Sequence, residues 1–414
     1  MSDQQNFDAL ETRENAVRES EQFAQLASQL THAKTNSPYF AQVLKDIDPA
    51  NIIDRDGLAK IAVTRKSDLV EGQRNTPPFG GLTGVPVGEI GRLFQSPGPI
   101  YDPEGREVDY WRTARGFHAA GFRGGDVVLN TLSYHLTPGG FILDSGAHAL
   151  GCAVIPAGPG NTEQQLEIIR DLKPNAYCGT PSFLRILLEK ADAQKIDTSC
   201  FTKALVTGEA LPPSVRDWFV ARGITVGQVY ATADLGAIAY ETSAKEGLVV
   251  DEGVIVEIVR PGTNDPVAEG EVGEVVVTNL MSKSYPLIRF GTGDLSAVLA
   301  GQSPCGRTNM RIKGWMGRAD QTTKVKGMFV HPGQINEVVK RFAEIKRGRL
   351  VVSNDDNRDA MTLQVEVENS SDDLAKAIGE QVQSVCKLRG AIEFVALGSL
   401  ANDGKVIDDI RTYD

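Results

Sequence analysis

The stretch GRADQTTKVKGMFVHPGQIN, residues 317–336, decides how the rest of the chain is interpreted. A basic, strand-like run at 323–326 stops at Gly327. Pro332 then opens a predicted helix at its first turn, where a missing N–H costs nothing. Because glycine frees the backbone to turn, the stretch by itself predicts a surface hairpin that leads into a helix.

Composition restricts the class of protein. The chain has 414 residues, enough for two or three domains, and its 41% hydrophobic and 23% charged residues are typical of a soluble globular protein. The net charge of −11 argues against a nucleic-acid partner, which needs a basic face. No apolar run approaches the roughly 18 residues of a membrane helix, and the polar, acidic N-terminus does not resemble a signal peptide.

The cysteines indicate the cellular compartment. There are five of them, an odd number without a CxxC pair, which favours reduced thiols. We therefore expect a cytoplasmic protein that binds neither nucleic acid nor membrane, and a homodimer stays open. The cysteines are Cys152, Cys178, Cys200, Cys305 and Cys386.

Strand and helix patterns alternate between residues 126 and 230, which implies a mainly parallel sheet covered by helices. Residues 248–297 alternate instead like antiparallel strands of a small barrel-like subdomain. We therefore predict an α/β fold with a large N-terminal domain. Short apolar runs predict its parallel strands at 127–130, 153–156, 176–179, 204–207 and 225–230.

Both ends of the chain have clear patterns. Residues 5–32 predict one amphipathic helix. The part after residue 320 predicts a small α+β domain with its own core. The predicted organisation is a domain at 1–317, a connection at 318–320 and a C-terminal domain at 321–414. The C-terminal domain is predicted to hold helices at 333–345 and 371–387 and strands at 349–353, 362–368 and 391–396.

Polar and glycine-rich segments follow four of the predicted parallel strands. Ligands of such sheets sit at the carboxyl ends of the strands, so these segments are the candidate binding site. They are residues 133–140, 180–183, 207–211 and 230–234.

Residues 317–336 resemble the hinge motif of the adenylate-forming enzymes, in the branch of phenylacetate-CoA ligase, whose pattern is GRxDDxxxxxGxNVFPxQIE. The resemblance extends over nearly the whole chain, and Asn336 departs from it. It implies that ATP, Mg2+, CoA and a carboxylic acid are bound, and that Asp320 is the hinge of a mobile C-terminal domain. Matching positions are Gly317, Arg318, Asp320, Gly327, Val330, Pro332, Gln334 and Ile335.

The resemblance assigns the nucleotide-binding residues. A turn of small residues would lie against adenine, an aromatic ring would stack on the base, and a carboxylate would accept both ribose hydroxyls. Taken alone, these residues are also compatible with a core tyrosine, an ordinary turn and a solvated arginine. In the larger domain they are Gly208, Glu209, Ala210, Tyr230, Ala231, Thr232 and Asp294; beyond it they are Arg318, Lys324 and Gly327.

Two charged residues are the predicted catalytic groups. Asp234 stands where the family has the glutamate that holds Mg2+, a hard cation that prefers carboxylate oxygen. Lys405 stands where the family has a mobile lysine, whose charge would stabilise the adenylation transition state. The alternatives are a helix N-cap for Asp234 and a tail lysine for Lys405.

Three residues resemble the walls of the acyl pocket: Tyr134, His135 and Phe183. A purely structural histidine is an equal alternative for His135. The sequence does not identify the acid, beyond the aryl or arylacetic class that the resemblance implies.

The family's phosphate loop, Ser-Ser-Gly-Thr-Thr-Gly-Lys-Pro, is replaced here by residues 95–103, QSPGPIYDP. Prolines remove N–H donors, and Asp102 adds a charge that repels phosphate. A rigid turn is therefore an equal alternative. We expect ATP to be weakened relative to AMP by more than about tenfold, compared with a relative that has the full loop. If ATP still binds tightly, the first basic residues to test are Arg106, Arg318, Lys324 and Lys326.

The expected function is an acyl-CoA ligase that forms an acyl-adenylate. Alternatives are an adenylate-forming enzyme with an amine or carrier-protein acceptor, and a nucleotide-binding relative without catalysis. No structural zinc is expected, because only Cys305 remains of the four ligands found in relatives and one thiolate cannot make a tetrahedral site.

Overall fold

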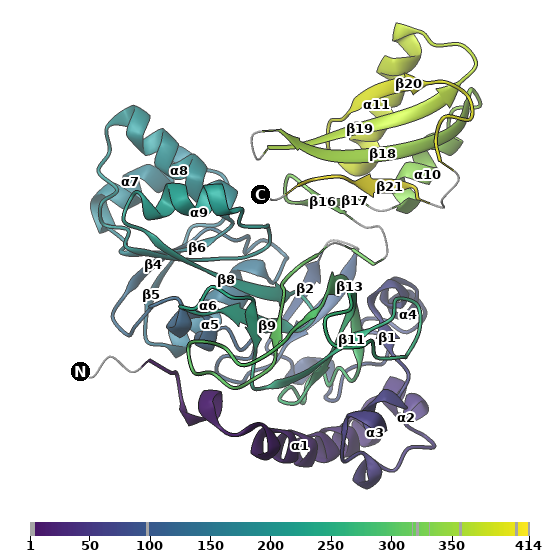
Figure 1. Cartoon of the computed structure of the whole chain (residues 1–414). Coiled ribbons are helices and arrows are strands. Elements are labelled where there is room, and N and C mark those ends of the chain that lie inside the picture. Colours follow the sequence, from purple (N-terminus) through teal and green to yellow (C-terminus); the bar gives the residue numbers. More distant parts are fainter. Residues whose placement is uncertain are drawn as a thin grey trace. The chain divides into compact units, whose positions relative to one another are not determined.

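The structure is a computed structural model that describes residues 5–96, 99–316, 318–319, 323–330, 332–355, 358–401 and 405–412. The chain divides into two compact units, Met1–Met316 and Gly317–Asp414, and the smaller is drawn in yellow and green in Figure 1. This division falls one residue before the predicted boundary. The predicted hinge residue Asp320 lies outside the described residues.

The larger unit is organised around a sheet whose described strands run in the order β14-β15-β10-β9-β8-β7-β6-β4-β5. Its parallel half matches the predicted strands, because each is a short apolar run between turn residues. From β9 onward the pairing is antiparallel. The strands are β4 (Val127–Asn130), β5 (Ala153–Pro156), β6 (Ala176–Gly179), β7 (Lys203–Val206), β8 (Thr225–Thr232), β9 (Gly236–Glu241), β10 (Leu248–Val250), β14 (Val298–Leu299) and β15 (Arg311–Ile312).

Helices cover both faces of the parallel half, as Figure 1 shows. Neighbouring side chains of a strand point to opposite faces. In β4, Val128 packs with Phe117 and Leu143 in one core, whereas Leu129 packs with Leu166 and Leu184 in the other. The covering helices are α5 (Ala114–Ala119), α6 (Gly139–Ala149), α7 (Thr162–Leu172), α8 (Pro181–Gln194) and α9 (Pro213–Val220).

A second sheet has the described strand order β1-β13-β12-β11. The antiparallel pairing of β11, β12 and β13 agrees with the expectation for residues 248–297. The parallel edge strand β1 comes from the N-terminal part of the chain, which the sequence pattern did not indicate. The strands are β1 (Thr64–Arg65), β11 (Val254–Val259), β12 (Gly273–Asn279) and β13 (Phe290–Ser296).

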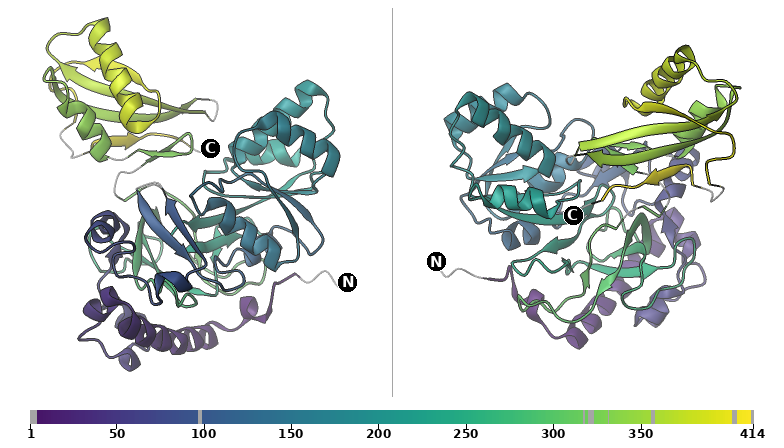
Figure 2. Two further views of the ribbon diagram at one scale, coloured as in Figure 1. Left: turned by 180° about the vertical axis from the view of Figure 1, so that it is seen from behind. Right: turned by 45° about the horizontal axis from the view of Figure 1, so that its top comes forward.

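The substituted phosphate loop forms a β-hairpin, drawn in blue in the rear view of Figure 2. Ser96 pairs with Ile100 next to the turn, and the pairing continues to Arg92 and Glu104. Residues 97 and 98 lie outside the described residues. The strands are β2 (Arg92–Ser96) and β3 (Ile100–Glu104).

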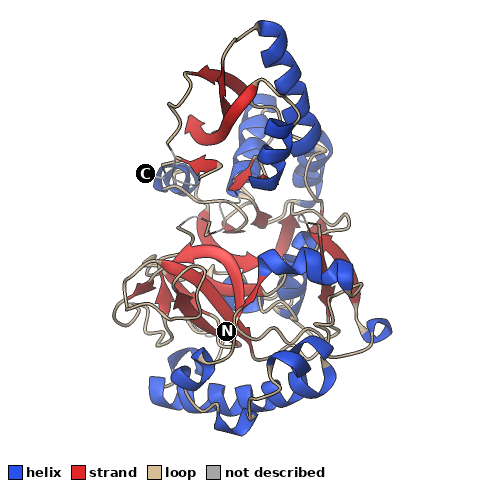
Figure 3. Ribbon diagram, turned by 90° about the vertical axis from the view of Figure 1, so that its right-hand side faces the viewer, coloured by secondary structure: helices blue, strands red, loops and turns tan. Residues whose placement is uncertain are grey.

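The N-terminal helices lie against the strand-rich part of the larger unit, as Figure 3 shows. The single helix predicted at 5–32 is wrong, since a short 3-10 turn at Ala9–Thr12 precedes α1. The helix does not extend into this turn. There the Glu11 side chain is buried and accepts a hydrogen bond from the Tyr240 hydroxyl at 2.8 Å. The helices are α1 (Asn15–Asn36), α2 (Pro38–Val43), α3 (Arg55–Ala59) and α4 (Leu69–Asn75), with 3-10 turns at Pro49–Asn51, Lys66–Asp68 and Val87–Glu89.

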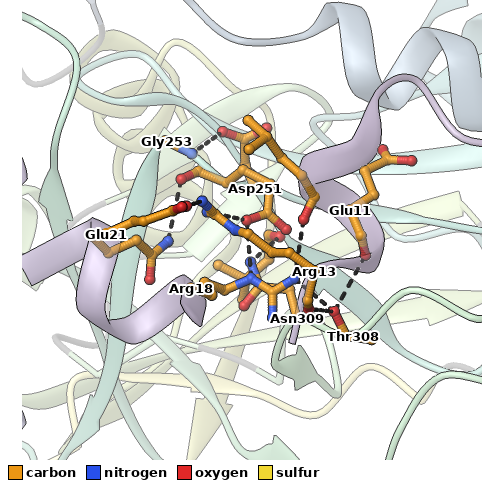
Figure 4. Close-up of polar contacts among 12 residues, drawn as sticks. Glu11, Arg13, Arg18, Glu21, Asp251, Gly253, Thr308 and Asn309 are labelled. Carbon is orange, nitrogen blue, oxygen red and sulfur yellow. Dashed lines mark hydrogen bonds and ion pairs between the residues drawn. The ribbon is translucent and has the colours of Figure 1, made fainter. Parts of the chain in front are cut away.

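Buried charges hold the start of α1 in place (Figure 4). Arg18 and Arg13 both contact Oε2 of Glu252, at 3.0 and 2.8 Å. The backbone N–H of Thr308 donates to the carbonyl of Glu11 at 3.0 Å. These partners lie more than 200 residues away in sequence, so the start of α1 is fixed by long-range contacts within the larger unit.

The smaller unit has a sheet with the described order β20-β19-β18-β21 and a separate β16–β17 hairpin. Ile335 and Val338 of α10 and Ile378 and Val382 of α11 share one core with the sheet. The elements are β16 (Thr323–Val325), β17 (Met328–Val330), α10 (Pro332–Lys340), β18 (Ile345–Asp355), β19 (Arg358–Val367), α11 (Asp372–Cys386), β20 (Ala391–Val395) and β21 (Ile407–Asp409). Among the described helices of both units, none is long and apolar enough to cross a membrane.

Candidate active site

Two residues predicted to bind adenosine lie in contact. The Tyr230 hydroxyl, at the end of β8, donates to Oδ2 of Asp294 in β13 at 2.8 Å. The indole N–H of Trp315 donates to the other oxygen, Oδ1, at 3.1 Å. Asp294 is therefore oriented from two sides, with its carboxylate at the place where the larger unit's two sheets approach each other.

The predicted adenine-binding turn follows β7. Gly208 has φ of +79°, a conformation in which a side chain is strained, so glycine suits this position. The Glu209 carboxylate accepts a hydrogen bond from the backbone N–H of Ser182 at 3.4 Å. This contact joins the turn to the start of α8, where Thr180 caps the helix and Phe183 follows. The structure thus brings two of the predicted segments together at the carboxyl edge of the sheet.

Asp234 is held by a residue that sequence reasoning missed. Its side chain is fully buried, and Oδ2 accepts a hydrogen bond from Nζ of Lys66 at 2.5 Å. Oδ1 is buried and has no hydrogen-bond partner among the described residues. Asp234 lies in the turn between β8 and β9, so the helix N-cap alternative is wrong. Lys66 stands in the N-terminal segment, between β1 and α4.

Asp102 of the β2–β3 hairpin lies close enough to interact with this pair. It is fully buried, and neither carboxylate oxygen has a hydrogen-bond partner in the described part of the protein. Burial, followed by the charge of Asp234, raises the pKa of Asp102 to about 8, although the charge of Lys66 acts in the opposite direction. The substituted loop therefore points a carboxyl group toward the predicted metal ligand.

Of the predicted acyl-pocket residues, Tyr134 is the most firmly held. Its hydroxyl donates to Oδ1 of Asp144 at 3.0 Å and accepts from the Asn130 amide at 2.8 Å. Burial, followed by the charge of Asp144, raises the pKa of Tyr134, which keeps the hydroxyl protonated. The rings of Tyr134 and Phe141 meet edge to face, with centroids 5.1 Å apart. His135, by contrast, is exposed, and its backbone N–H donates a hydrogen bond to the Ser133 hydroxyl.

The remaining predicted residues belong to the smaller unit. Lys405 is half exposed, and its Nζ donates to Oδ1 of Asp408 at 2.9 Å. Gly327 has φ of +81° in the turn of the β16–β17 hairpin, with open space where a side chain would stand. The carbonyl of Lys324 accepts a hydrogen bond from Arg411 at 2.8 Å, and Arg318 is partly buried.

No group of three or more potential metal-ligating acid, histidine or cysteine side chains occurs among the described residues. At the position of the zinc ligands of relatives, Sγ of Cys305 lies 3.0 Å from the Ser303 hydroxyl. Arg307 lies beside it, paired with Glu11 at 3.0 Å.

A large unit built on a mainly parallel sheet, followed by a separate small α+β unit, is the architecture of adenylate-forming enzymes. The chain belongs to the AMP-binding enzyme family: residues 108–285 match the AMP-binding enzyme family itself, and residues 327–409 match the AMP-binding enzyme C-terminal domain.

Similar proteins agree with this membership. Phenylacetate-coenzyme A ligase of Aromatoleum evansii is 30% identical over 363 residues, which cover 84% of this chain and 81% of the relative. The Escherichia coli enzyme of the same name is 29% identical over 386 residues, covering 88% and 86%. Among solved structures, 2-hydroxyisobutyryl-CoA ligase in complex with its acyl-AMP and CoA superimposes with a TM-score of 0.83 at 25% identity, covering 98% of this chain and 92% of that one.

These comparisons confirm the predicted family and the predicted fold class. The chain is an enzyme of the AMP-forming acyl-CoA ligase family.

Proposed function

We propose that this enzyme activates an aryl or arylacetic carboxylic acid with ATP and transfers the acyl group to CoA. The single observation that supports it best is the Tyr230–Asp294 contact at the sheet edge, where an aromatic ring and a carboxylate suited to adenosine lie together. The similarity to phenylacetate-CoA ligases over most of the chain supports the substrate class.

In the first half-reaction, a carboxylate oxygen of the acid attacks the α-phosphorus of ATP and pyrophosphate leaves. Lys405 would place its ammonium group near the developing negative charge, where it stabilises the transition state more than the ground state. Asp234 fits a role as Mg2+ ligand, because it is a buried carboxylate with an oxygen that lacks a hydrogen-bond donor. Bound Mg2+ would neutralise phosphate charge.

In the second half-reaction, the CoA thiolate attacks the acyl carbon and AMP leaves. Rotation about Asp320 would withdraw Lys405 and bring Gly327 beside the pantetheine arm. A glycine suits this position because a residue with a side chain would be strained at φ of +81°. The space beside Gly327 is open, so the pantetheine arm could approach the backbone there. Tyr134 and Phe141 would offer an aromatic wall to the acyl group.

One observation favours a second candidate function. The phosphate loop is replaced by a hairpin with a buried carboxyl group at Asp102, which favours a relative that binds nucleotide without activating an acid. An amine or carrier-protein acceptor in place of CoA would leave adenylation itself unchanged.

Pyrophosphate release from ATP, measured over a panel of aromatic and short-chain acids with and without CoA, separates these functions. We expect release with an arylacetic acid and an acyl-CoA thioester only when CoA is added. Release without any thioester would indicate another acceptor. Absence of release with every acid would contradict the proposal and favour a non-catalytic relative.

A further inference from the structure

Three segments that are distant in sequence place charged groups together near the carboxyl edge of the parallel sheet, where the predicted adenosine-binding residues lie. Asp102 comes from the β2–β3 hairpin, Asp234 from the β8–β9 turn and Lys66 from the segment before α4. In the described part of the chain, both oxygens of the fully buried Asp102 and Oδ1 of Asp234 lack a hydrogen-bond partner. Oδ2 of Asp234 accepts a hydrogen bond from the Lys66 ammonium at 2.5 Å.

The charges of this cluster do not balance. Two carboxylates stand against the single ammonium of Lys66, so full ionisation leaves one negative charge in a buried place. Buried carboxylates are normally paired, hydrogen-bonded or bound to a metal ion. Because an ionised carboxylate accepts hydrogen bonds but does not donate them, the oxygens of Asp102 and Oδ1 of Asp234 require either a shared proton or a cation.

We infer that Asp102 is a second carboxylate ligand, with Asp234, of a divalent cation that binds the β- and γ-phosphates of ATP. This inference rests on the proposed function. Asp102 and Asp234, both ionised, carry a charge of −2, which one divalent cation neutralises. The hairpin would therefore take the place of the family's loop by completing a cation site rather than by supplying a positive side chain.

The chemistry of the donor set suits magnesium. Mg2+ in nucleotide sites is held by one or two carboxylates together with substrate phosphates and water. The described residues offer no larger ligand group, so phosphate oxygens would complete the shell. Lys66 occupies Oδ2 of Asp234 in the nucleotide-free protein and would be free to turn toward a phosphate once the cation is bound.

The test is the Asp102→Asn variant, with calorimetric titrations of ATP and AMP in excess Mg2+ and in EDTA. With Mg2+, we expect ATP affinity to fall at least about tenfold. Loss of a residue that only supports a metal ligand already lowers metal affinity by about 10–100-fold, so loss of a ligand itself should cost at least as much. In EDTA, the variant should bind ATP as tightly as the wild type or more tightly, because a repelling carboxylate has gone. AMP affinity in EDTA should stay within about twofold.

Glu104→Gln is the matched control, since Glu104 lies on the same strand but its carboxylate accepts two hydrogen bonds from Arg92 at 2.9 Å. It should leave all four affinities unchanged. If Asp102→Asn tightens ATP both with and without Mg2+, Asp102 only repels phosphate and the inference is wrong. Unchanged ATP affinity in Mg2+ overturns it equally.

A measurement on the wild type covers the case in which the variant does not fold. Protein labelled with 13C at aspartate carboxylates, loaded with Mn2+ and ATP, should show electron–nuclear couplings from two carboxylate carbons. Coupling from one carbon would contradict a role for Asp102, and coupling from none would also remove Asp234. These readouts do not need turnover, so a failed pyrophosphate assay would refute the proposed function and leave this inference to be judged separately.

Discussion

The ammonium group of Lys66 lies 2.5 Å from Oδ2 of Asp234, although 168 residues separate the two along the chain. The contact brings a cation from the N-terminal segment to the edge of the parallel sheet, beside the hairpin that replaces the phosphate loop. Lys66 is therefore a better candidate for a phosphate contact than Arg106, whose guanidinium donates to the carbonyls of Glu89 and Ile90.

Replacing Lys66 by alanine should weaken ATP more than AMP. A hydrogen bond between charged groups contributes about 1.5–3 kcal/mol, so we expect ATP affinity to fall by about tenfold or more. AMP affinity should change far less. Titration calorimetry of both nucleotides measures this, with Lys60→Ala as the control because Lys60 is an exposed lysine of the same segment. Equal loss of ATP and AMP affinity would show that Lys66 acts on folding or on the α-phosphate instead.

Replacing Lys405 by alanine should abolish adenylation but leave thioester formation from supplied acyl-AMP intact. Loss of one transition-state donor lowers a rate by about 10²–10³. The Lys405 side chain is half exposed and pairs with Asp408, whereas its contact with Arg349 uses the backbone carbonyl, which alanine keeps, so the fold should tolerate the change. Lys376→Ala, an exposed lysine of α11, is the control. If both half-reactions slow equally, the assignment of Lys405 to the first one fails.

The purified protein should contain no structural zinc. One thiolate cannot form a tetrahedral site, and Cys305 has hydrogen-bond partners in Ser303 and Arg307. Elemental analysis of metal per chain, after dialysis without chelator, checks this. A stoichiometric zinc content would show that ligands were misjudged.

Cys305 should be the most reactive thiol near neutral pH. Burial alone would raise the pKa of Cys305. Hydrogen bonds with Ser303, Thr242 and Arg307 outweigh burial and lower this pKa to about 7. Because the thiolate is the nucleophile, its alkylation rate should rise through pH 7 and level off above pH 8. Burial raises the pKa of Cys152 and Cys386 to about 11, so these should react slowly throughout.

Alkylation by iodoacetamide, followed by peptide mass spectrometry between pH 5.5 and 9, measures these rates. Cys305→Ser should remove the fast phase and leave the slow ones. A Cys305 rate that still rises steeply between pH 8 and 9 would mean that its pKa is not lowered.

The parts of the fold that were predictable are those coded locally. Strands β4, β5 and β6 have the predicted bounds because each is a short apolar run that ends at turn residues. Tyr230 and Asp294 were recognisable because each stands in a short pattern with glycine or threonine neighbours. Their mutual contact follows from the sheets and was not visible in either pattern.

What could not be predicted depends on contacts between distant segments. The direction of the Asp102 side chain is set by the hairpin register, and its effect depends on Asp234 and Lys66, which lie far away in sequence. The N-terminal helix was predicted too early because the buried contact of Glu11 with Tyr240, 229 residues away, interrupts it. Amphipathic periodicity does not report either kind of contact.

The most direct test of the central claim, that a carboxylate is activated as an adenylate, uses phenylacetate labelled with 18O in both carboxyl oxygens. The full-length enzyme is incubated with this acid, ATP, Mg2+ and CoA, and the products are analysed by mass spectrometry. Because the acid's oxygen attacks the α-phosphorus and stays on it when the acyl group leaves, we predict one 18O atom in AMP. Label in inorganic phosphate, or AMP without label, would contradict the account.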